Sequence, residues 1–225
     1  MIPLKAKTLL RRIWYLYTKN PNRFLTFVSG VVHVGASSGQ ERKLYKHHGL
    51  RVAWVEPIPE IFAQLKENIK DFPDQQAFEA LVTDVDGKEY EFNISSNKGQ
   101  SSSILNLKDH KDIWPDVEYT TSIQIKSKTL PTLFAEHNVN PSQYQALIMD
   151  TQGSELLVLQ GAVPILQNFE FIKTEVPDFE SYEGCCQLKD IESFMQQQGY
   201  KELSRHAFAT RDEGGSYYDI VYRKK

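Results

Sequence analysis

A glycine-bearing turn between a buried strand and a helix is the feature that most constrains how this chain can fold. The β-branched run at residues 31–34 predicts a buried strand, residues 35–39 form a turn with glycine at both ends, and residues 40–48 predict a short helix. Residues 51–56 predict a second strand. A strand, a helix and a second strand in this order indicate a parallel βαβ unit, because parallel strands need a crossover connection.

The same alternation resumes after an irregular middle section. The later predicted elements are, in order, a helix at 61–69, strands at 78–82 and 122–125, a helix at 130–137, a strand at 146–150, a helix at 155–166, a strand at 171–176 and a helix at 188–198. Two closing strands, at 201–208 and 216–223, flank a glycine-rich turn and should be antiparallel. The chain therefore predicts an α/β fold with helices on both faces of a mainly parallel sheet and an antiparallel C-terminal hairpin.

The middle section predicts an insertion into this framework. The dipeptide Asp86-Gly87 is a turn signal between residues 78–82 and residues 89–94. These two segments are therefore expected to pair as a β-hairpin. The following segment, residues 97–103, is a polar loop rich in serine and glycine.

Length, charge and cysteine content limit the classes of protein to which the chain can belong. It has 225 residues, 40% of them hydrophobic, which is enough for one well-cored domain over residues 26–225. The net charge of −3 gives no global basic field, so we expect no nucleic-acid partner. Cys185 and Cys186 are neighbours, which excludes a disulfide scaffold and fits a reducing, cytoplasmic compartment. No apolar run has the length of a transmembrane segment.

Basic residues are concentrated at the N-terminus. The residues that carry positive charge before the first acidic residue, Glu41, are Lys5, Lys7, Arg11, Arg12, Lys19 and Arg23. Apolar residues interleave with them at helical spacing, so residues 1–25 predict a basic amphipathic helix. Such a helix could pack its apolar side on the main domain, serve as an interface or lid, or make weak contact with an anionic membrane surface.

The turn after the first strand and the acid that ends the second strand together indicate a ligand site. Gly35 removes a Cβ where a ligand could approach, and the helix start offers free N–H groups. Glu56 could accept hydrogen bonds from a ribose diol. A dinucleotide fingerprint has a glycine where this chain has Ser37, so S-adenosylmethionine, which has no pyrophosphate, fits better than a nicotinamide cofactor. The alternatives are an NAD-type oxidoreductase, or a structural turn beside an incidental acid.

Five short motifs extend this interpretation. They read HVGASSGQE at 33–41, VEP at 55–57, GQSSS at 99–103, MDTQGSE at 149–155 and VLQGA at 158–162. Together they resemble the motifs of FkbM-type methyltransferases. The resemblance implies a class I, Rossmann-like methyltransferase that uses S-adenosyl-L-methionine. Members of that family typically methylate hydroxyl groups on natural products or glycans, which implies a small-molecule or glycan acceptor.

The resemblance and the strand–turn pattern define a set of candidate cofactor-binding residues. They are Gly35, Ala36, Ser37, Gly39, Gln40, Glu41, Glu56, Pro57, Ala80, Leu81, Ser102, Asp150 and Thr151. The chain departs from the family at His33, where many members have an acid that can help to hold the amino end of the cofactor. A cationic histidine would repel that ammonium group, whereas a neutral one could accept a hydrogen bond.

Three residues are candidates for catalysis. Methyl transfer to a hydroxyl needs a base near the acceptor oxygen, and Asp150 and Glu175 end successive strands of the predicted sheet. Each has a structural alternative, since Asp150 could cap a helix and Glu175 could be a solvated loop acid. His33 is the third candidate, although a histidine inside a strand is more often a satisfied core residue. No histidine or cysteine spacing indicates a metal site, so we expect none, and a non-catalytic module with the same fold is a further alternative.

Overall fold

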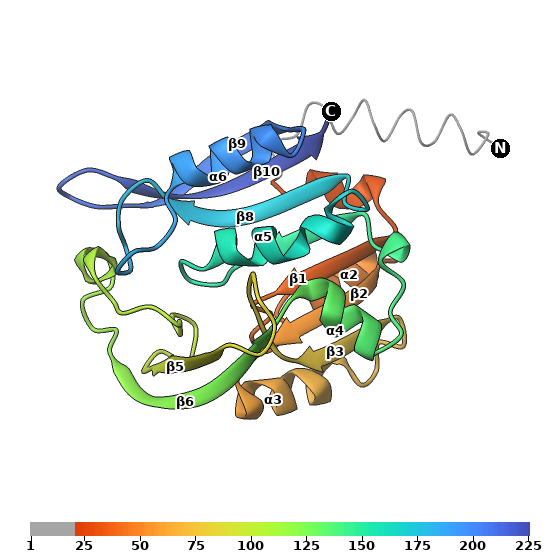
Figure 1. Cartoon of the computed structure of the whole chain (residues 1–225), viewed down its shortest axis with the longest axis horizontal. Helices are drawn as coiled ribbons and strands as arrows, with labels where there is room; N and C mark the ends of the chain where they lie inside the picture. Colours follow the sequence, from red (N-terminus) through yellow and green to blue (C-terminus); the bar gives the residue numbers. More distant parts are fainter. Residues whose placement is uncertain (1–20) are drawn as a thin grey trace.

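The computed structural model describes residues 21–225, which form a mixed β-sheet covered by helices on both faces. The strands of the main sheet are β1 (Gly30–Val34), β2 (Arg51–Glu56), β3 (Gln75–Glu79), β7 (Ala146–Met149), β8 (Phe171–Pro177), β9 (Tyr200–Thr210) and β10 (Ser216–Lys224). This seven-stranded sheet has the order β3-β2-β1-β7-β8-β10-β9 (Figure 1). The strands from β3 to β8 in this order are parallel, and β10 is antiparallel to both of its neighbours. The predicted α/β class and the antiparallel C-terminal hairpin are confirmed.

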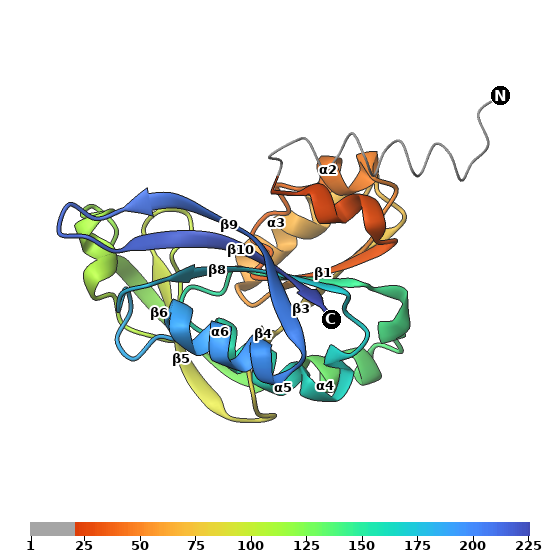
Figure 2. The same ribbon diagram turned by 90° about the horizontal axis from the view of Figure 1, so that it is seen from above.

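Helices cover both faces of the sheet because its central strands are apolar on both sides. The helical elements on one face are η1 (Arg23–Phe27), α2 (Arg42–His47) and α3 (Pro59–Ile69), and those on the other are α4 (Leu130–Glu136), α5 (Glu155–Leu166) and α6 (Leu188–Gln197) (Figure 2). On β1, Val31 packs on the face covered by η1, α2 and α3, and Val32 packs on the face covered by α4, α5 and α6. Burial on both faces explains why the parallel strands read as continuous apolar runs.

The insertion forms a second sheet, and here one prediction was wrong. Its strands are β4 (Leu81–Val82), β5 (Glu89–Ser95) and β6 (Tyr119–Lys128), in the order β4-β6-β5. The predicted hairpin between residues 78–82 and 89–94 does not form, because β5 pairs antiparallel with β6 and β4 pairs parallel with it.

Asp86 explains why the turn signal misled the prediction. Its carboxylate accepts hydrogen bonds from the backbone N–H of Thr129, at 2.6 Å, and from the hydroxyl of Thr132, at 2.8 Å. The N–H of Gly87 donates to the carbonyl of Ser127. The turn is therefore anchored to the end of β6 and the start of α4 rather than closing a two-residue loop.

The N-terminal prediction falls mostly outside the described part of the chain. The expected amphipathic helix over residues 1–25 lies outside it except for its last residues, of which Arg23 onward belongs to the 3-10 helix η1. Phe24 and Leu25 of η1 are buried, and the ring centroid of Phe24 lies 5.8 Å from that of Phe171 on β8. Among the helices formed by residues 21–225, none has the length and apolar character that a membrane span requires.

Candidate active site

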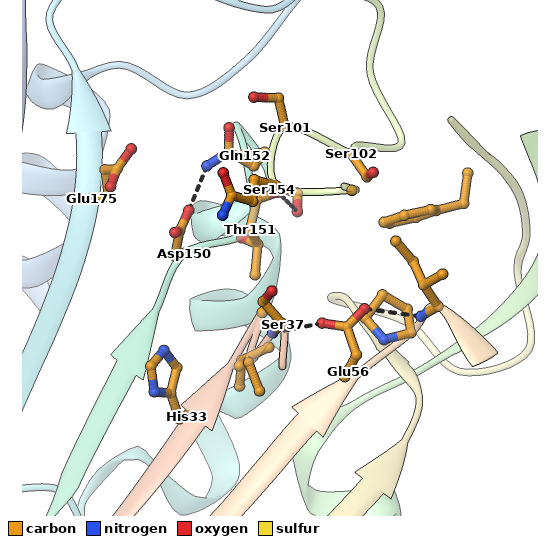
Figure 3. Close-up of a pocket in the computed structure, with 18 of the residues that line it drawn as sticks. His33, Ser37, Glu56, Ser101, Ser102, Asp150, Thr151, Gln152, Ser154 and Glu175 are labelled. Atoms are coloured by element: carbon orange, nitrogen blue, oxygen red, sulfur yellow. Dashed lines mark hydrogen bonds between the residues drawn. The ribbon is translucent and has the colours of Figure 1, made fainter. Parts of the chain in front are cut away.

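A cavity of about 370 Å³ lies at the carboxyl ends of β1, β2, β7 and β8. Parallel strands present the start of every following loop at this edge, which is where open α/β sheets bind ligands. The predicted site residues that line it are His33, Gly35, Ala36, Ser37, Gln40, Glu41, Glu56, Pro57, Ala80, Leu81, Ser102, Asp150, Thr151 and Glu175. Segments far apart in the sequence therefore meet in one place, as Figure 3 shows for His33, Glu56, Asp150 and Glu175.

Gly35 is required by the backbone where the loop leaves β1. Its φ is +78°, and a Cβ at this position would lie 1.8 Å from the carbonyl oxygen of Asp150. The N–H groups of Gly35 and Ala36 both donate to the carbonyl of Val55 on β2, at 3.0 Å. The loop is thus held across the ends of three neighbouring strands, and only glycine fits at its first position.

Gly39 is the exception among the predicted cofactor-binding residues, because it does not line the cavity. Its φ is +72°, and a Cβ would lie 2.6 Å from a methyl group of Leu65 on α3. The second glycine of the motif is therefore explained by a left-handed turn and by close packing against a helix. The motif spacing alone could not distinguish this packing role from ligand contact.

Glu56 is buried at the centre of the loop, with 4% of its surface exposed. One carboxylate oxygen accepts from the N–H of Ser37 at 2.8 Å, and the other accepts from the N–H of Ile58 at 3.0 Å (Figure 3). Burial raises its pKa to about 7 in spite of these two donors. Each oxygen has a second lone pair, so the carboxylate can still accept hydrogen bonds from two ligand hydroxyls.

An apolar wall lies beside Glu56. Ile58, Leu81 and Phe92 form a separate buried cluster, and all three line the cavity together with Ala80. The wall suits a flat apolar or heteroaromatic group next to the carboxylate. Phe92 was not among the predicted site residues, because it comes from β5 of the insertion and only the long-range pairing of β5 with β6 brings it here.

The serine loop, residues 97–103, forms internal hydrogen bonds and also lines the cavity. The hydroxyl of Ser102 accepts from the N–H of Ser95 at 3.0 Å, and Asn97 bonds to both the N–H and the hydroxyl of Ser101. Ser101 and Ser102 also line the cavity. The loop is joined to the opposite rim by Ser103, whose hydroxyl donates to the carbonyl of Gln152 at 2.7 Å.

Asp150 points into the cavity and does not cap α5. Its carboxylate accepts a hydrogen bond from the side-chain amide of Gln152 (Figure 3). The turn before α5 is instead closed by Glu155, which accepts from the N–H groups of Thr151, at 2.8 Å, and Gly153. Burial raises the pKa of Asp150 to about 7, and the negative charge of Glu155 adds to the rise.

Glu175 is the second buried acid at this edge. Burial, together with the charges of Asp150 and Asp219, raises its pKa well above the ordinary value. Asp219 is its register partner on β10 and is paired with Lys173 at 3.0 Å. Because two buried like charges disfavour full ionisation, Asp150 and Glu175 retain a proton to a higher pH than isolated carboxyls would.

His33 lines the cavity as a neutral group. Its Nδ1 lies 3.0 Å from the hydroxyl of Tyr45, and its ring stacks on Trp54 with centroids 5.1 Å apart. Burial, assisted by the charge of Lys173, lowers its pKa to about 3. A carboxylate of Glu41 lies 4.0 Å from the same nitrogen. Within residues 21–225, no group of three or more metal-ligating side chains is arranged to hold an ion.

The cavity also contains residues that were not among the predicted site residues. These are Val34, Ile58, Val82, Phe92, Asn97, Gly99, Gln100, Ser101, His110, Trp114, Gln152, Ser154 and Phe208. Most belong to the insertion, the loop after β7 or the C-terminal hairpin. For Gln152, the available signal was its place inside the motif that begins at Met149, beside the predicted base.

Comparison with known proteins identifies the family. Residues 33–202 match the family model described as the methyltransferase FkbM domain. The chain belongs to this family. Among curated proteins, the 2-O-methyltransferase NoeI of Sinorhizobium fredii is 27% identical over 169 residues, which cover 72% of this chain and 68% of NoeI. The FkbM match makes the chain a methyltransferase and confirms the family that the motifs resemble.

Solved structures confirm the class I methyltransferase fold. The structure of M. capricolum TrmK in complex with S-adenosyl-homocysteine has a TM-score of 0.50 at 9% identity, covering 92% of this chain and 69% of TrmK. The METTL16 methyltransferase domain has a TM-score of 0.52 at 8% identity, covering 100% of this chain and 69% of that domain. At these identities the similarity concerns the fold alone.

Proposed function

We propose that this FkbM-family protein is an S-adenosylmethionine-dependent O-methyltransferase that acts on a hydroxyl of a glycan or natural product. The observation that carries the proposal is the buried carboxylate of Glu56, fixed by two backbone N–H groups beside the Gly35 loop. A carboxylate in this position is suited to a ribose diol. The 2-O-methyltransferase NoeI supports an oxygen acceptor.

The residues of the cavity fit S-adenosylmethionine. Glu56 would hold the ribose, the apolar wall of Ile58, Leu81 and Phe92 would cover the adenine, and the methionine end would extend towards His33 and Glu41. A neutral His33 does not repel an ammonium group, and the carboxylate of Glu41 can attract one. When bound, the cofactor supplies a sulfonium methyl group, whose transfer forms the C–O bond, breaks the C–S bond and leaves S-adenosylhomocysteine.

Asp150 is the base in this proposal. Its carboxylate lies at the cavity surface, is oriented by the amide of Gln152, and takes the proton of the acceptor hydroxyl. Burial, with the negative charge of Glu155, keeps the pKa of Asp150 high enough for a base that works near neutral pH, and the charge of Asp150 in turn raises the pKa of the neighbouring Glu175. His33, with a pKa of about 3, is too weak a base for this role and acts as a neutral hydrogen-bonding group.

The pH dependence of turnover follows from the raised pKa of Asp150. Only the ionised carboxylate accepts a proton, so at saturating cofactor kcat should rise with pH through about 7, the pKa that burial gives this group. An aspartate with an ordinary pKa would already be fully active two units lower. A kcat that stays flat from acidic pH through neutrality would contradict the assignment of Asp150 as base.

Replacing Glu56 by glutamine tests the cofactor site. The variant loses charge-assisted hydrogen bonds to the ribose, so the Kd for S-adenosylhomocysteine should rise about 10- to 100-fold at alkaline pH. Isothermal titration calorimetry measures this change. The matched control is Glu79→Gln, since Glu79 is the register partner of Glu56 on β3 but is exposed and outside the cavity. Equal affinities for the Glu56 and Glu79 variants would reject the ribose assignment.

A nicotinamide cofactor fits this loop less well. The N–H of Ser37, at the position where a dinucleotide site brings its backbone against the pyrophosphate, already donates to Glu56. Titration with NAD, which should show no binding where S-adenosylhomocysteine binds, separates the two cofactors. A protein that bound S-adenosylhomocysteine but transferred no methyl group to any acceptor would instead be a non-catalytic module.

A further inference from the structure

Part of the cavity is lined by a group of aromatic side chains. His110 and Trp114 of the insertion and Phe208 of β9 line this part of the cavity, and Tyr217 of β10 lies behind them. We call these four residues the aromatic wall. Trp114 has its ring centroid 4.7 Å from that of His110 and 5.2 Å from that of Tyr217, and the centroids of Phe208 and Tyr217 are 5.9 Å apart.

The aromatic wall is connected to the proposed base through two side chains, Tyr182 and Gln152. The ring of His110 contacts that of Tyr182, at 5.2 Å between centroids, and the Tyr182 hydroxyl donates to the side-chain oxygen of Gln152 at 2.5 Å. The amide of the same Gln152 donates to Asp150. An acceptor on the wall would therefore lie next to the carboxylate that takes its proton.

Phe208 is directed towards the wall by an irregularity in its strand. Ala207 pairs with Tyr218 and Ala209 pairs with Tyr217, so Phe208 is the extra residue of a β-bulge. Bulges redirect a side chain and are frequent next to active sites. Phe208 remains 43% exposed although it lines the cavity and lies beside Tyr217, so much of its apolar surface is open to a ligand.

The wall is held together by ion pairs between the insertion and the C-terminal hairpin. Arg211, at the turn between β9 and β10, pairs with Asp112 and, at 3.5 Å, with Asp109 of the 3-10 helix η2 (Asp109–Asp112). The guanidinium also lies 4.7 Å from the ring centroid of Phe179. In Figures 1 and 2 the yellow-green η2 segment lies near the tip of the blue hairpin. These contacts join the segment that carries Trp114 to the hairpin that carries Phe208, and both rings lie next to Tyr217.

The polar groups of the cavity limit the chemistry of the acceptor. The ionisable side chains that line it, among residues 21–225, are the carboxylates of Glu41, Glu56, Asp150 and Glu175 and the imidazoles of His33 and His110. This set repels phosphate groups, which protein sites usually bind with cations or helix N-termini. His110 is 1% exposed, and its Nδ1 has no hydrogen-bond partner in the described chain, an uncommon state for a buried polar atom.

We propose that the aromatic wall is the acceptor subsite and that it binds an uncharged pyranose ring of a glycan or glycoside. This inference rests on the proposed methyltransferase function. Trp114 and Phe208 pack against the apolar C–H face of the sugar, and Ser101 of the serine loop bonds to its hydroxyls. One ring hydroxyl then faces Asp150, which takes its proton as the oxygen accepts the methyl group.

The experiment measures methyl transfer to a panel of probes by release of S-adenosylhomocysteine. The panel contains methyl pyranosides and their short oligosaccharides, mannitol as an open-chain polyol without a ring face, and a single-stranded RNA oligonucleotide. The full chain should methylate pyranosides and not mannitol or RNA. Trp114→Ala and Phe208→Ala should each raise KM for the pyranoside roughly tenfold, with kcat and the Kd for S-adenosylhomocysteine little changed.

Two variants control for indirect effects. Leu203→Ala removes another exposed apolar side chain from β9 that lies outside the cavity, and should leave KM unchanged. Trp114→Phe keeps an aromatic face and should recover most of the affinity. Failure of the wild-type chain to bind S-adenosylhomocysteine would reject the proposed function itself. Binding of that product with no methylation of any pyranoside, preference for RNA or mannitol, or an unchanged KM in both alanine variants would overturn the acceptor subsite.

Discussion

Replacing Asp150 by asparagine should lower kcat by about 10²–10⁴-fold, the usual contribution of a positioned base. Asparagine has the same shape but cannot take the proton of the acceptor hydroxyl. The folded structure should persist, because the turn before α5 is held by Glu155 and not by Asp150. The measurement is turnover at saturating cofactor and acceptor, together with the Kd for S-adenosylhomocysteine.

The control for this variant is Asp84→Asn, since Asp84 is exposed and outside the cavity. That substitution should change neither turnover nor affinity. Full turnover by the Asp150 variant would remove this residue as the base. Loss of activity that simply followed a loss of cofactor affinity would make Asp150 a binding residue only.

The second large effect is expected for Gly35→Ala. The new Cβ would lie 1.8 Å from the carbonyl oxygen of Asp150, and φ is +78°, so the loop has to move. Left-handed strain of about 1–2 kcal/mol and overpacking of about 1–3 kcal/mol add up, and the displaced loop should lose S-adenosylhomocysteine binding. Denaturant unfolding and calorimetry measure the two effects.

Gly49→Ala is the matched control for Gly35. Gly49 also has a positive φ, +68°, but a Cβ there meets nothing within 4 Å. The Gly49→Ala variant should therefore lose only the stability that corresponds to the backbone strain, and its cofactor binding should be intact. If the Gly35 variant were as stable as the Gly49 variant and bound the product equally well, the close approach of the loop to β7 would not matter for the site.

The parallel framework could be predicted because its signals are local. The strand from Arg51 to Glu56 ends where Pro57 forces it to end, and its apolar run reflects burial on both faces. Strand order then brings Asp150 and Glu56 to the same edge without any knowledge of side-chain contacts. For this reason the candidate base and the candidate ribose acid could both be located from sequence.

The part of the cavity that we propose as the acceptor subsite could not be predicted, because long-range contacts create it. β5 pairs with β6 across the intervening loop that carries His110 and Trp114, and no periodic pattern marks those two residues. The alternation of side chains along β9 does not predict that Phe208 faces the cavity, because the β-bulge changes the direction of this side chain. Asp86 and Gly87 do form a turn, but the hydrogen bonds of the Asp86 carboxylate go to Thr129 and Thr132, which are distant in the sequence.

The most direct test of the proposed cofactor site is a crystal structure of the protein in complex with S-adenosylhomocysteine. We expect both ribose hydroxyls at hydrogen-bonding distance from the carboxylate of Glu56, the adenine against Ile58, Leu81 and Phe92, and the sulfur facing Asp150. A product molecule bound elsewhere, or bound in the cavity with its ribose away from Glu56, would contradict this assignment.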